Sequence, residues 1–117
     1  MKWNRITSGE DLEKIAALSA EQPVMVFKHS TTCNISRTAL DRIERSWDDN
    51  ALNQPVPFYL DLLSYRSLSN QIAEDFNIEH QSPQLLLISK GKAVYEATHF
   101  DINYRELLEQ VKALDVH

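Results

Sequence analysis

Apolar and polar residues recur along the chain with two different periods, and the longer of them predicts four helices. Each helical segment carries apolar residues three or four positions apart, which places them on one side of a helix. The first segment spans about residues 9–20, and the second follows the single cysteine, Cys33. The four apolar stripes consist of Leu12, Ile15, Ala16 and Leu18; Ile35, Ala39, Leu40, Ile43 and Trp47; Leu68, Ile72 and Phe76; and Leu107, Leu108, Val111 and Leu114.

Short apolar runs rich in strand-forming residues lie between these helices and predict a sheet. Some are apolar throughout, which is typical of strands buried on both faces. The last two runs flank the turn Lys90-Gly91-Lys92 and are therefore expected to form a hairpin. The predicted strands cover residues 24–27, 56–61, 84–88 and 93–98, and residues 3–6 form a candidate short strand in front of them.

The order of these elements predicts the fold class. Strands connected by helices imply right-handed parallel crossovers, and the final hairpin adds an antiparallel pair. We therefore expect an α/β domain with a mixed four- to five-stranded sheet and helices on both faces, the architecture of the thioredoxin fold. The chain of 117 residues contains only two glycines, four prolines and no internal repeat. It is predicted to form a single domain over residues 1–117.

Polar residues in front of the helical segments predict where the helices begin. Such residues accept hydrogen bonds from the unpaired N–H groups of a first helical turn. The first helix is expected to start with a capping box, in which a threonine and a glutamate satisfy each other's backbone amides. The expected capping residues are Thr7 with Glu10, then Thr31 or Thr32, Ser64 and Asp101.

Composition and charge exclude several classes of function. The formal net charge is −5 and the basic residues are scattered, so a nucleic-acid or anionic-membrane surface is not expected. No apolar run approaches the ~20 residues that span a bilayer, and the first residues do not resemble a signal peptide, so we expect a cytoplasmic protein. One cysteine forms no internal disulfide and supplies at most one thiolate ligand. We therefore expect no metal site and no bound cofactor.

Cys33 is the residue on which a chemical function depends. It lies between a predicted buried strand and an amphipathic helix, where the N–H groups of the first turn, those of Ile35 and Ser36 among them, have no partner within the helix. These N–H groups and the positive end of the helix dipole favour the thiolate, which is the nucleophilic form of cysteine.

Burial of Cys33 as a small apolar residue is the alternative interpretation, because free cysteine is among the most frequently buried residues. The polarity of its neighbours argues against burial, and Cys33 lies outside the apolar stripe of the helix that follows. The polar neighbours are Thr31, Thr32, Asn34 and Ser36.

Ser36 stands three residues after Cys33, at the position that holds the resolving thiol in a two-cysteine redox motif. A serine forms no disulfide, so it does not release a bound substrate in this way. Two interpretations of Ser36 remain open. Its hydroxyl donates a hydrogen bond to the Cys33 sulfur, or it is an ordinary serine in the first turn of a helix, where serine is common.

Ser82-Pro83, directly before a predicted strand, forms a second group of interest. Only ~5–6% of X–Pro bonds in folded proteins are cis, but thioredoxin-like proteins hold a cis-proline at this point, facing the cysteine. The backbone of Ser82 is then free to pair with an extended substrate. By the same fold, His99 and Phe100 approach Cys33. His99 could transfer protons or bind an acidic group of a small thiol, or be an ordinary loop histidine.

The segment from Phe27 to Ser36 resembles the monothiol bacilliredoxins of the YtxJ type. The resemblance continues through Ser46-Trp47 and covers nearly the whole chain, including Trp3 and Ser82-Pro83. It implies a thioredoxin-fold protein that removes bacillithiol from modified cytosolic proteins, with bacillithiol or another low-molecular-weight thiol as co-substrate. It also implies Cys33 as nucleophile and Pro83 as the cis-proline. Asn34 stands where relatives often carry proline or serine.

The predicted site consists of Cys33 and Ser36 as catalytic residues, with substrate-binding residues around them. Because the chain has no second cysteine, an external thiol must resolve any mixed disulfide formed on Cys33. The expected partners are S-thiolated proteins and a small thiol, and the expected oligomeric state is a monomer. The substrate-binding residues are expected to be Thr32, Asn34, Ser82, Pro83 and His99.

Three alternatives remain. A non-catalytic thioredoxin-like adaptor would use the same face to bind a partner. A glutathione-type monothiol glutaredoxin typically carries Cys-Gly-Phe-Ser, which differs from Cys33-Asn34-Ile35-Ser36. An arsenate-reductase-like enzyme also begins Cys-x-x-Ser, but it needs a cluster of arginines that is not evident in this sequence.

Overall fold

A five-stranded mixed sheet forms the centre of the protein in the computed structural model, which describes residues 1–51 and 54–114. The strand order is β1-β3-β2-β4-β5. β1, β3 and β2 are parallel, whereas β4 runs antiparallel to both β2 and β5. The strands are β1 (Asn4–Arg5), β2 (Val24–His29), β3 (Val56–Asp61), β4 (Gln84–Ser89) and β5 (Lys92–Thr98). The predicted mixed sheet and its final hairpin are therefore confirmed.

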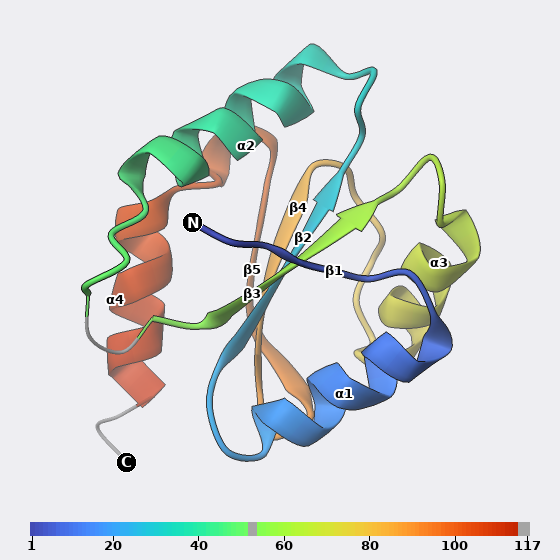
Figure 1. The fold of residues 1–117 in the computed structure, drawn as a ribbon, viewed down its shortest axis with the longest axis horizontal. Helices are drawn as coiled ribbons and strands as arrows, with labels where there is room; N and C mark the ends of the chain where they lie inside the picture. The colour runs from blue at the N-terminus through green and yellow to red at the C-terminus, as the bar shows by residue number, and fades with distance from the viewer. Residues whose placement is uncertain (52–53, 115–117) are drawn as a thin grey trace.

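Within the described residues, four α-helices cover the two faces of this sheet (Figure 1). α2 (Asn34–Ser46) and α4 (Tyr104–Leu114) pack on one face, and α1 (Gly9–Ser19) and α3 (Arg66–Asp75) pack on the other. Alternate residues of β2 point into two separate apolar cores. Met25 and Phe27 pack with α2 and α4, whereas Val24 and Val26 pack on the side of α1 and α3. No described helix is both long enough and apolar enough to cross a membrane.

β2 continues two residues beyond its predicted end. Lys28 and His29 are polar, and the apolar pattern therefore placed the end of the strand at Phe27. Their backbones nevertheless pair with Leu60 and Asp61 of β3. Ladder hydrogen bonds depend on the backbone and not on side-chain polarity, so both residues remain in the strand and are buried there.

The start of α1 differs from the prediction by one residue. Ser8, and not Thr7, is the N-cap. The carboxylate of Asp11, and not that of Glu10, accepts a hydrogen bond from the Thr7 N–H at 2.9 Å. Adjacent candidates of the same type compete at this helix start, and the direction of the chain between β1 and α1 decides which of them is used.

The predicted caps of the two later helices are also wrong. Ser64 donates a hydrogen bond to the Asp61 carboxylate at 3.1 Å, and α3 begins after Tyr65. Asp101 belongs to a 3-10 turn, η1 (His99–Asp101), that comes before α4. The side chain of Asn103 accepts the Glu106 N–H at 3.0 Å and caps α4 instead. In both cases a turn that the sequence pattern did not predict moves the helix start toward the C-terminus.

Candidate active site at the start of helix α2

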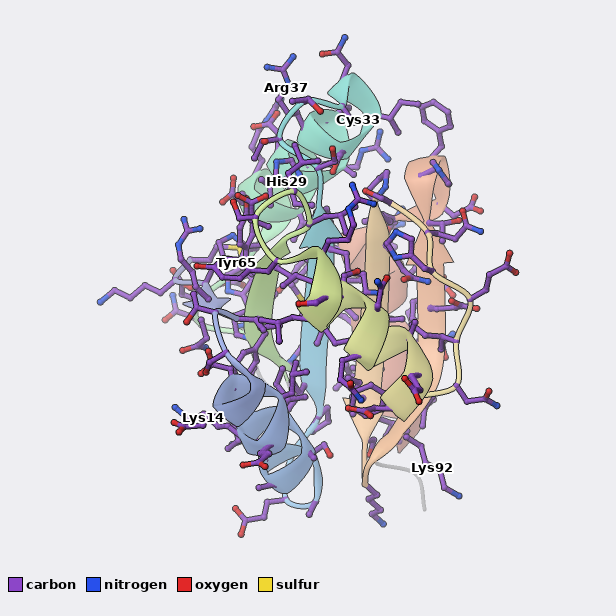
Figure 2. The ribbon with its side chains drawn as sticks, turned by 90° about the vertical axis from the view of Figure 1, so that its right-hand side faces the viewer. Lys14, His29, Cys33, Arg37, Tyr65 and Lys92 are labelled. Carbon is purple, nitrogen blue, oxygen red and sulfur yellow. The ribbon has the colours of Figure 1, made fainter. Side chains whose placement is uncertain are left out.

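Cys33 is the N-cap residue of α2, between β2 and the helix. Its backbone is extended, its side chain makes no capping hydrogen bond, and it is partly exposed. It therefore replaces Thr31 and Thr32, the residues expected to cap this helix. The first turn of α2 contains no acidic residue, so no carboxylate of that turn offsets the positive end of the helix dipole. Figure 2 shows Cys33 at the same end of the sheet as His29 and Arg37.

Ser36 lies in the first turn of α2 and is fully buried. Its Oγ accepts a hydrogen bond from the Ser30 N–H at 3.0 Å and lies 2.7 Å from Nδ1 of His29. His29 is only 3% exposed, and its ring packs against the rings of Phe27 and Tyr59. Ser36 is therefore not an ordinary serine of a first helical turn. Its hydrogen bonds connect α2 to the end of β2.

The electrostatic environment of His29 favours the neutral imidazole. Burial lowers the pKa of His29, and the carboxylates of Asp61 and Glu44 oppose this shift. The positive charge of Arg37 adds to the lowering. Asp61 belongs to β3 and is the register partner of His29, whereas Glu44 and Arg37 belong to α2.

Two exposed residues flank the cysteine. Thr32 precedes it, and Asn34 is the first residue of α2. The Asn34 side chain accepts a hydrogen bond from the guanidinium of Arg37, which fixes this basic group one turn from the thiol. Ile35, which the apolar stripe placed in the core, is instead 36% exposed next to Cys33. Ile35 is the second residue of α2. At this position its side chain points away from the sheet.

The segment before β4 lies at the end of the sheet where β2 leads into Cys33. The Ser82–Pro83 peptide bond is cis, as expected for the thioredoxin fold. The carbonyl of Pro83 accepts the His99 N–H at 3.2 Å, which places η1 beside this segment. Among the described residues, the Ser82 backbone makes no hydrogen bond to another backbone group, and its Oγ is buried without a partner. His99 is partly exposed, and Phe100 next to it is 72% exposed.

Comparison with known proteins identifies the family of this chain. The family model described as monothiol bacilliredoxin BrxC matches residues 4–107. The chain belongs to this family. A structure described as that of a proposed oxidoreductase with a thioredoxin fold is 31% identical and has a TM-score of 0.73. The match covers 92% of this chain and 91% of that one. The bacilliredoxin resemblance drawn from the sequence is thus confirmed.

More distant structures confirm the thioredoxin fold. Chloroplastic thioredoxin z is 22% identical, with a TM-score of 0.71 over 100% of this chain and 97% of that one. Thioredoxin f from spinach chloroplast is 15% identical, with a TM-score of 0.69 over 97% and 94% of the two chains. Family and fold together indicate a thiol redox function for this bacilliredoxin.

A second polar cluster lies on the other face of the sheet, below α3. Lys28 is fully buried there, and its Nζ donates a hydrogen bond to the Ser69 carbonyl at 3.0 Å. Its Nζ also lies 3.3 Å from Nδ1 of His80. Burial lowers the pKa of Lys28 to about 8, and burial followed by the charge of Lys28 lowers the pKa of His80. His80 is therefore part of a polar network around the buried Lys28.

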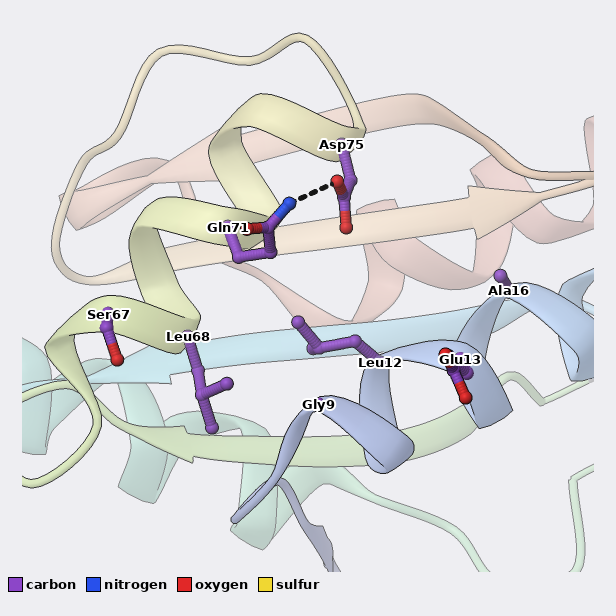
Figure 3. Close-up of a pocket in the computed structure, with 8 residues that line it drawn as sticks. All are labelled: Gly9, Leu12, Glu13, Ala16, Ser67, Leu68, Gln71 and Asp75. Atoms are coloured by element: carbon purple, nitrogen blue, oxygen red, sulfur yellow. Dashed lines mark hydrogen bonds between the residues drawn. The ribbon is translucent and has the colours of Figure 1, made fainter.

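The cleft between α1 and α3 is not part of the thiol site. Leu12 of α1 and Leu68 of α3 line opposite sides of it, and Gln71 donates a hydrogen bond to Asp75 at 2.6 Å (Figure 3). Cys33 does not line this cleft. In the described part of the chain, no three His, Cys, Asp or Glu side chains form a cluster that could hold a metal ion.

The contact between His29 and Ser36 is the site feature that the sequence analysis missed. The sequence contains one indication of this contact, because side chains along β2 alternate between the two faces of the sheet. Met25, Phe27 and His29 are two residues apart and must share the face that α2 covers. The sequence shows this shared face but not the distance between the strand end and the first turn of the helix.

Proposed function

We propose that the protein is a monothiol thiol–disulfide oxidoreductase that removes a low-molecular-weight thiol, bacillithiol, from cytosolic proteins that carry it as a mixed disulfide. The observation that carries the proposal is the position of Cys33. It is a partly exposed cysteine at the N-cap of a 13-residue helix whose first turn contains no acidic side chain. A partly exposed cysteine can be reached by a disulfide, and the thiolate is the form of cysteine that attacks disulfide sulfurs.

The proposed reaction has two exchange steps. In the first, the Cys33 thiolate attacks the small-thiol sulfur of the mixed disulfide, and the client cysteine leaves as a thiolate. Cys33 then carries the small thiol. In the second step, the thiolate of another small-thiol molecule attacks that adduct, so a small-thiol disulfide forms and Cys33 is released as a thiolate. The second thiol must come from outside, because Cys33 is the only cysteine of the chain.

The surrounding residues have separate roles in this proposal. Ser36 is assigned to stabilise the Cys33 thiolate through its hydroxyl. The unpaired backbone of Ser82, beside Pro83, is assigned to pair with the extended client segment. Thr32, Asn34 and His99 would border the small thiol, and the exposed side chains of Ile35 and Phe100 offer apolar contacts to a client. The protein would act in the cytosol as a monomer with no bound cofactor.

The proposal predicts selective adduct formation on Cys33. The reduced protein is incubated separately with the disulfides of bacillithiol, glutathione and coenzyme A, and its intact mass is then measured. We expect one bacillithiol per chain, formed faster than the adduct of either other thiol, and no adduct on the Cys33→Ser variant.

Two results would contradict this proposal, each in a different way. An adduct formed only with glutathione would indicate a glutaredoxin-type activity. No adduct with any of the three disulfides would favour a non-catalytic adaptor, in which the face around Cys33 binds a partner without exchange.

A further inference from the structure

Residues 79–82 form a short irregular segment between α3 and β4, and this segment ends at Ser82, whose backbone is assigned to pair with the client. Among the described residues, none of these four makes a hydrogen bond from its backbone to another backbone group. Helices and strands are held by such bonds, so this segment needs a different support. Its position therefore depends on side chains of the neighbouring elements.

Two fully buried polar side chains of the sheet contact this segment. Lys28 of β2 and Gln84 of β4 are register partners, and partners in an antiparallel pair direct their side chains to the same face. The Gln84 amide donates a hydrogen bond to the Glu79 carbonyl at 3.0 Å. Nζ of Lys28 lies 3.3 Å from Nδ1 of His80. The sheet thus holds the segment at two successive residues.

The ammonium group of Lys28 requires an acceptor on His80. An ammonium group has hydrogens to donate and no lone pair, so Nδ1 of His80 accepts and the ring hydrogen lies on Nε2. The Ser69 hydroxyl is also 3.3 Å from this nitrogen, and the Ser69 carbonyl accepts from Lys28 at 3.0 Å. Among the described residues, no carboxylate forms a salt bridge with Lys28. Loss of the His80 acceptor would therefore leave part of a buried charge without a partner, which is costly.

We propose that Lys28, acting through His80, is a positioning residue that holds residues 79–82 so that the Ser82 backbone is presented to an extended client peptide. Only one residue separates His80 from Ser82, so a displacement of the imidazole also displaces the backbone that pairs. The pairing uses backbone groups alone, and the client is therefore recognised as an extended chain, whatever its side chains. This role in client binding rests on the proposed function.

The position of Lys28 separates its role from the chemistry of the thiol. Side chains alternate along a strand, and Lys28 points to the face on which α3 packs. Cys33 caps α2, which packs on the opposite face. We therefore expect the contact between Lys28 and His80 to affect exchange with peptides, and not the intrinsic reactivity of Cys33.

The test compares two disulfides that differ in whether an extended peptide surrounds the reacting bond. One contains an uncharged seven-residue peptide with a central cysteine, and the other contains N-acetylcysteine amide. In both, the cysteine sulfur is bonded to nitrothiobenzoate. The Cys33 thiolate attacks the cysteine sulfur, and nitrothiobenzoate leaves with the electron pair as a coloured thiolate, so absorbance gives both rates at pH 7. We expect the wild type to react at least about fivefold faster with the peptide.

His80→Leu and His80→Asn are the matched variants, and both keep the charge of Lys28. Leucine has no acceptor, whereas the side-chain oxygen of asparagine can take the place of Nδ1. In His80→Leu we expect the peptide reaction to slow about fivefold, as for one lost hydrogen bond, with the N-acetylcysteine amide reaction unchanged. In His80→Asn we expect both rates to stay within about twofold of the wild type. Lys28→Met should reproduce the result of His80→Leu.

Equal slowing of both disulfides in His80→Leu would overturn the positioning role, because a general loss of structure or of thiol reactivity affects both. An unchanged peptide rate in His80→Leu would also overturn it, as would equal slowing of the peptide reaction in His80→Asn and His80→Leu. If His80→Leu or Lys28→Met does not fold, the other variant carries the same comparison.

The two disulfides of this test contain no bacillithiol, so the two proposals fail separately. Failure of the proposed function appears as the absence of a bacillithiol adduct while the peptide effect of His80→Leu persists. Failure of the positioning role appears as the loss of that peptide effect while the bacillithiol adduct still forms on Cys33.

Discussion

Replacing Cys33 with serine is expected to abolish release of the small thiol from a protein mixed disulfide. A hydroxyl is not ionised near neutral pH and forms no disulfide, so the first exchange step has no nucleophile and the adduct that the second step resolves never forms. The fold should not suffer, because serine is a better N-cap residue than cysteine and can accept a hydrogen bond from the first turn of α2. The measurement is the release of bacillithiol from a bacillithiolated protein, followed by mass spectrometry, with circular dichroism as the check on folding.

Ser36→Ala is the matched comparison for this experiment, because it keeps the nucleophile. It removes the hydroxyl assigned to the thiolate and leaves the Ser30 N–H and His29 without their partner. A lost hydrogen bond to a charged group, worth about 1.5 kcal/mol, corresponds to exchange slowed about tenfold. Turnover by a folded Cys33→Ser variant would exclude Cys33 as the nucleophile. Complete inactivation by Ser36→Ala would show that the hydroxyl is essential to the reaction.

Lys28 is expected to make the stability of the protein rise with pH in the alkaline range. In the unfolded chain a lysine keeps its proton up to a pKa of 10.5, whereas burial lowers the pKa of Lys28 to about 8 in the folded protein. Between these values the unfolded state binds more protons, so the free energy of unfolding increases with pH. This pKa shift corresponds to a gain of about 3 kcal/mol in the free energy of unfolding. The gain is absent below about pH 8 and complete above about pH 10.5.

The measurement compares the wild type with Lys28→Met, which has a side chain of similar length that does not titrate. Urea unfolding at several values between pH 7 and pH 10.5 should show the wild type gaining about 3 kcal/mol relative to the variant. Other alkaline groups titrate in both proteins and cancel in the difference. Lys14→Met, at an exposed position of α1, is the control and should show no such trend. A difference between wild type and Lys28→Met that stays constant with pH would contradict the burial of a charged Lys28.

The elements of this fold could be predicted from the sequence because each carries a long periodic signal. The all-apolar core of β2 and the stripe of Ala39 and Ile43 on α2 are examples, and both are buried as expected. Helix starts could not be predicted to the residue. Thr7 and Ser8 have the same chemistry, and only the path of the chain selects Ser8. Ile35 was misassigned because it matches the period of the stripe, but at the helix start Ser36, and not Ile35, faces the end of β2.

The site itself was predictable to a different extent for each residue. Cys33 follows from composition and from its place between a strand and a helix. The polar residues at the end of β2 were not predicted to be buried, because a lysine and a histidine in sequence are typical of a strand that reaches solvent. Lys28 is buried because α3 and the segment that contains His80 cover that end of the strand. Such coverage is a property of the tertiary structure, and no local pattern encodes it.

The rate at which Cys33 reacts with iodoacetamide at pH 7 tests the central claim most directly. A model thiol such as N-acetylcysteine is only a few per cent ionised at this pH. If the start of α2 stabilises the thiolate, Cys33 should react about tenfold faster than the model thiol. A rate equal to or below that of N-acetylcysteine, in folded protein, would contradict the account and favour the adaptor.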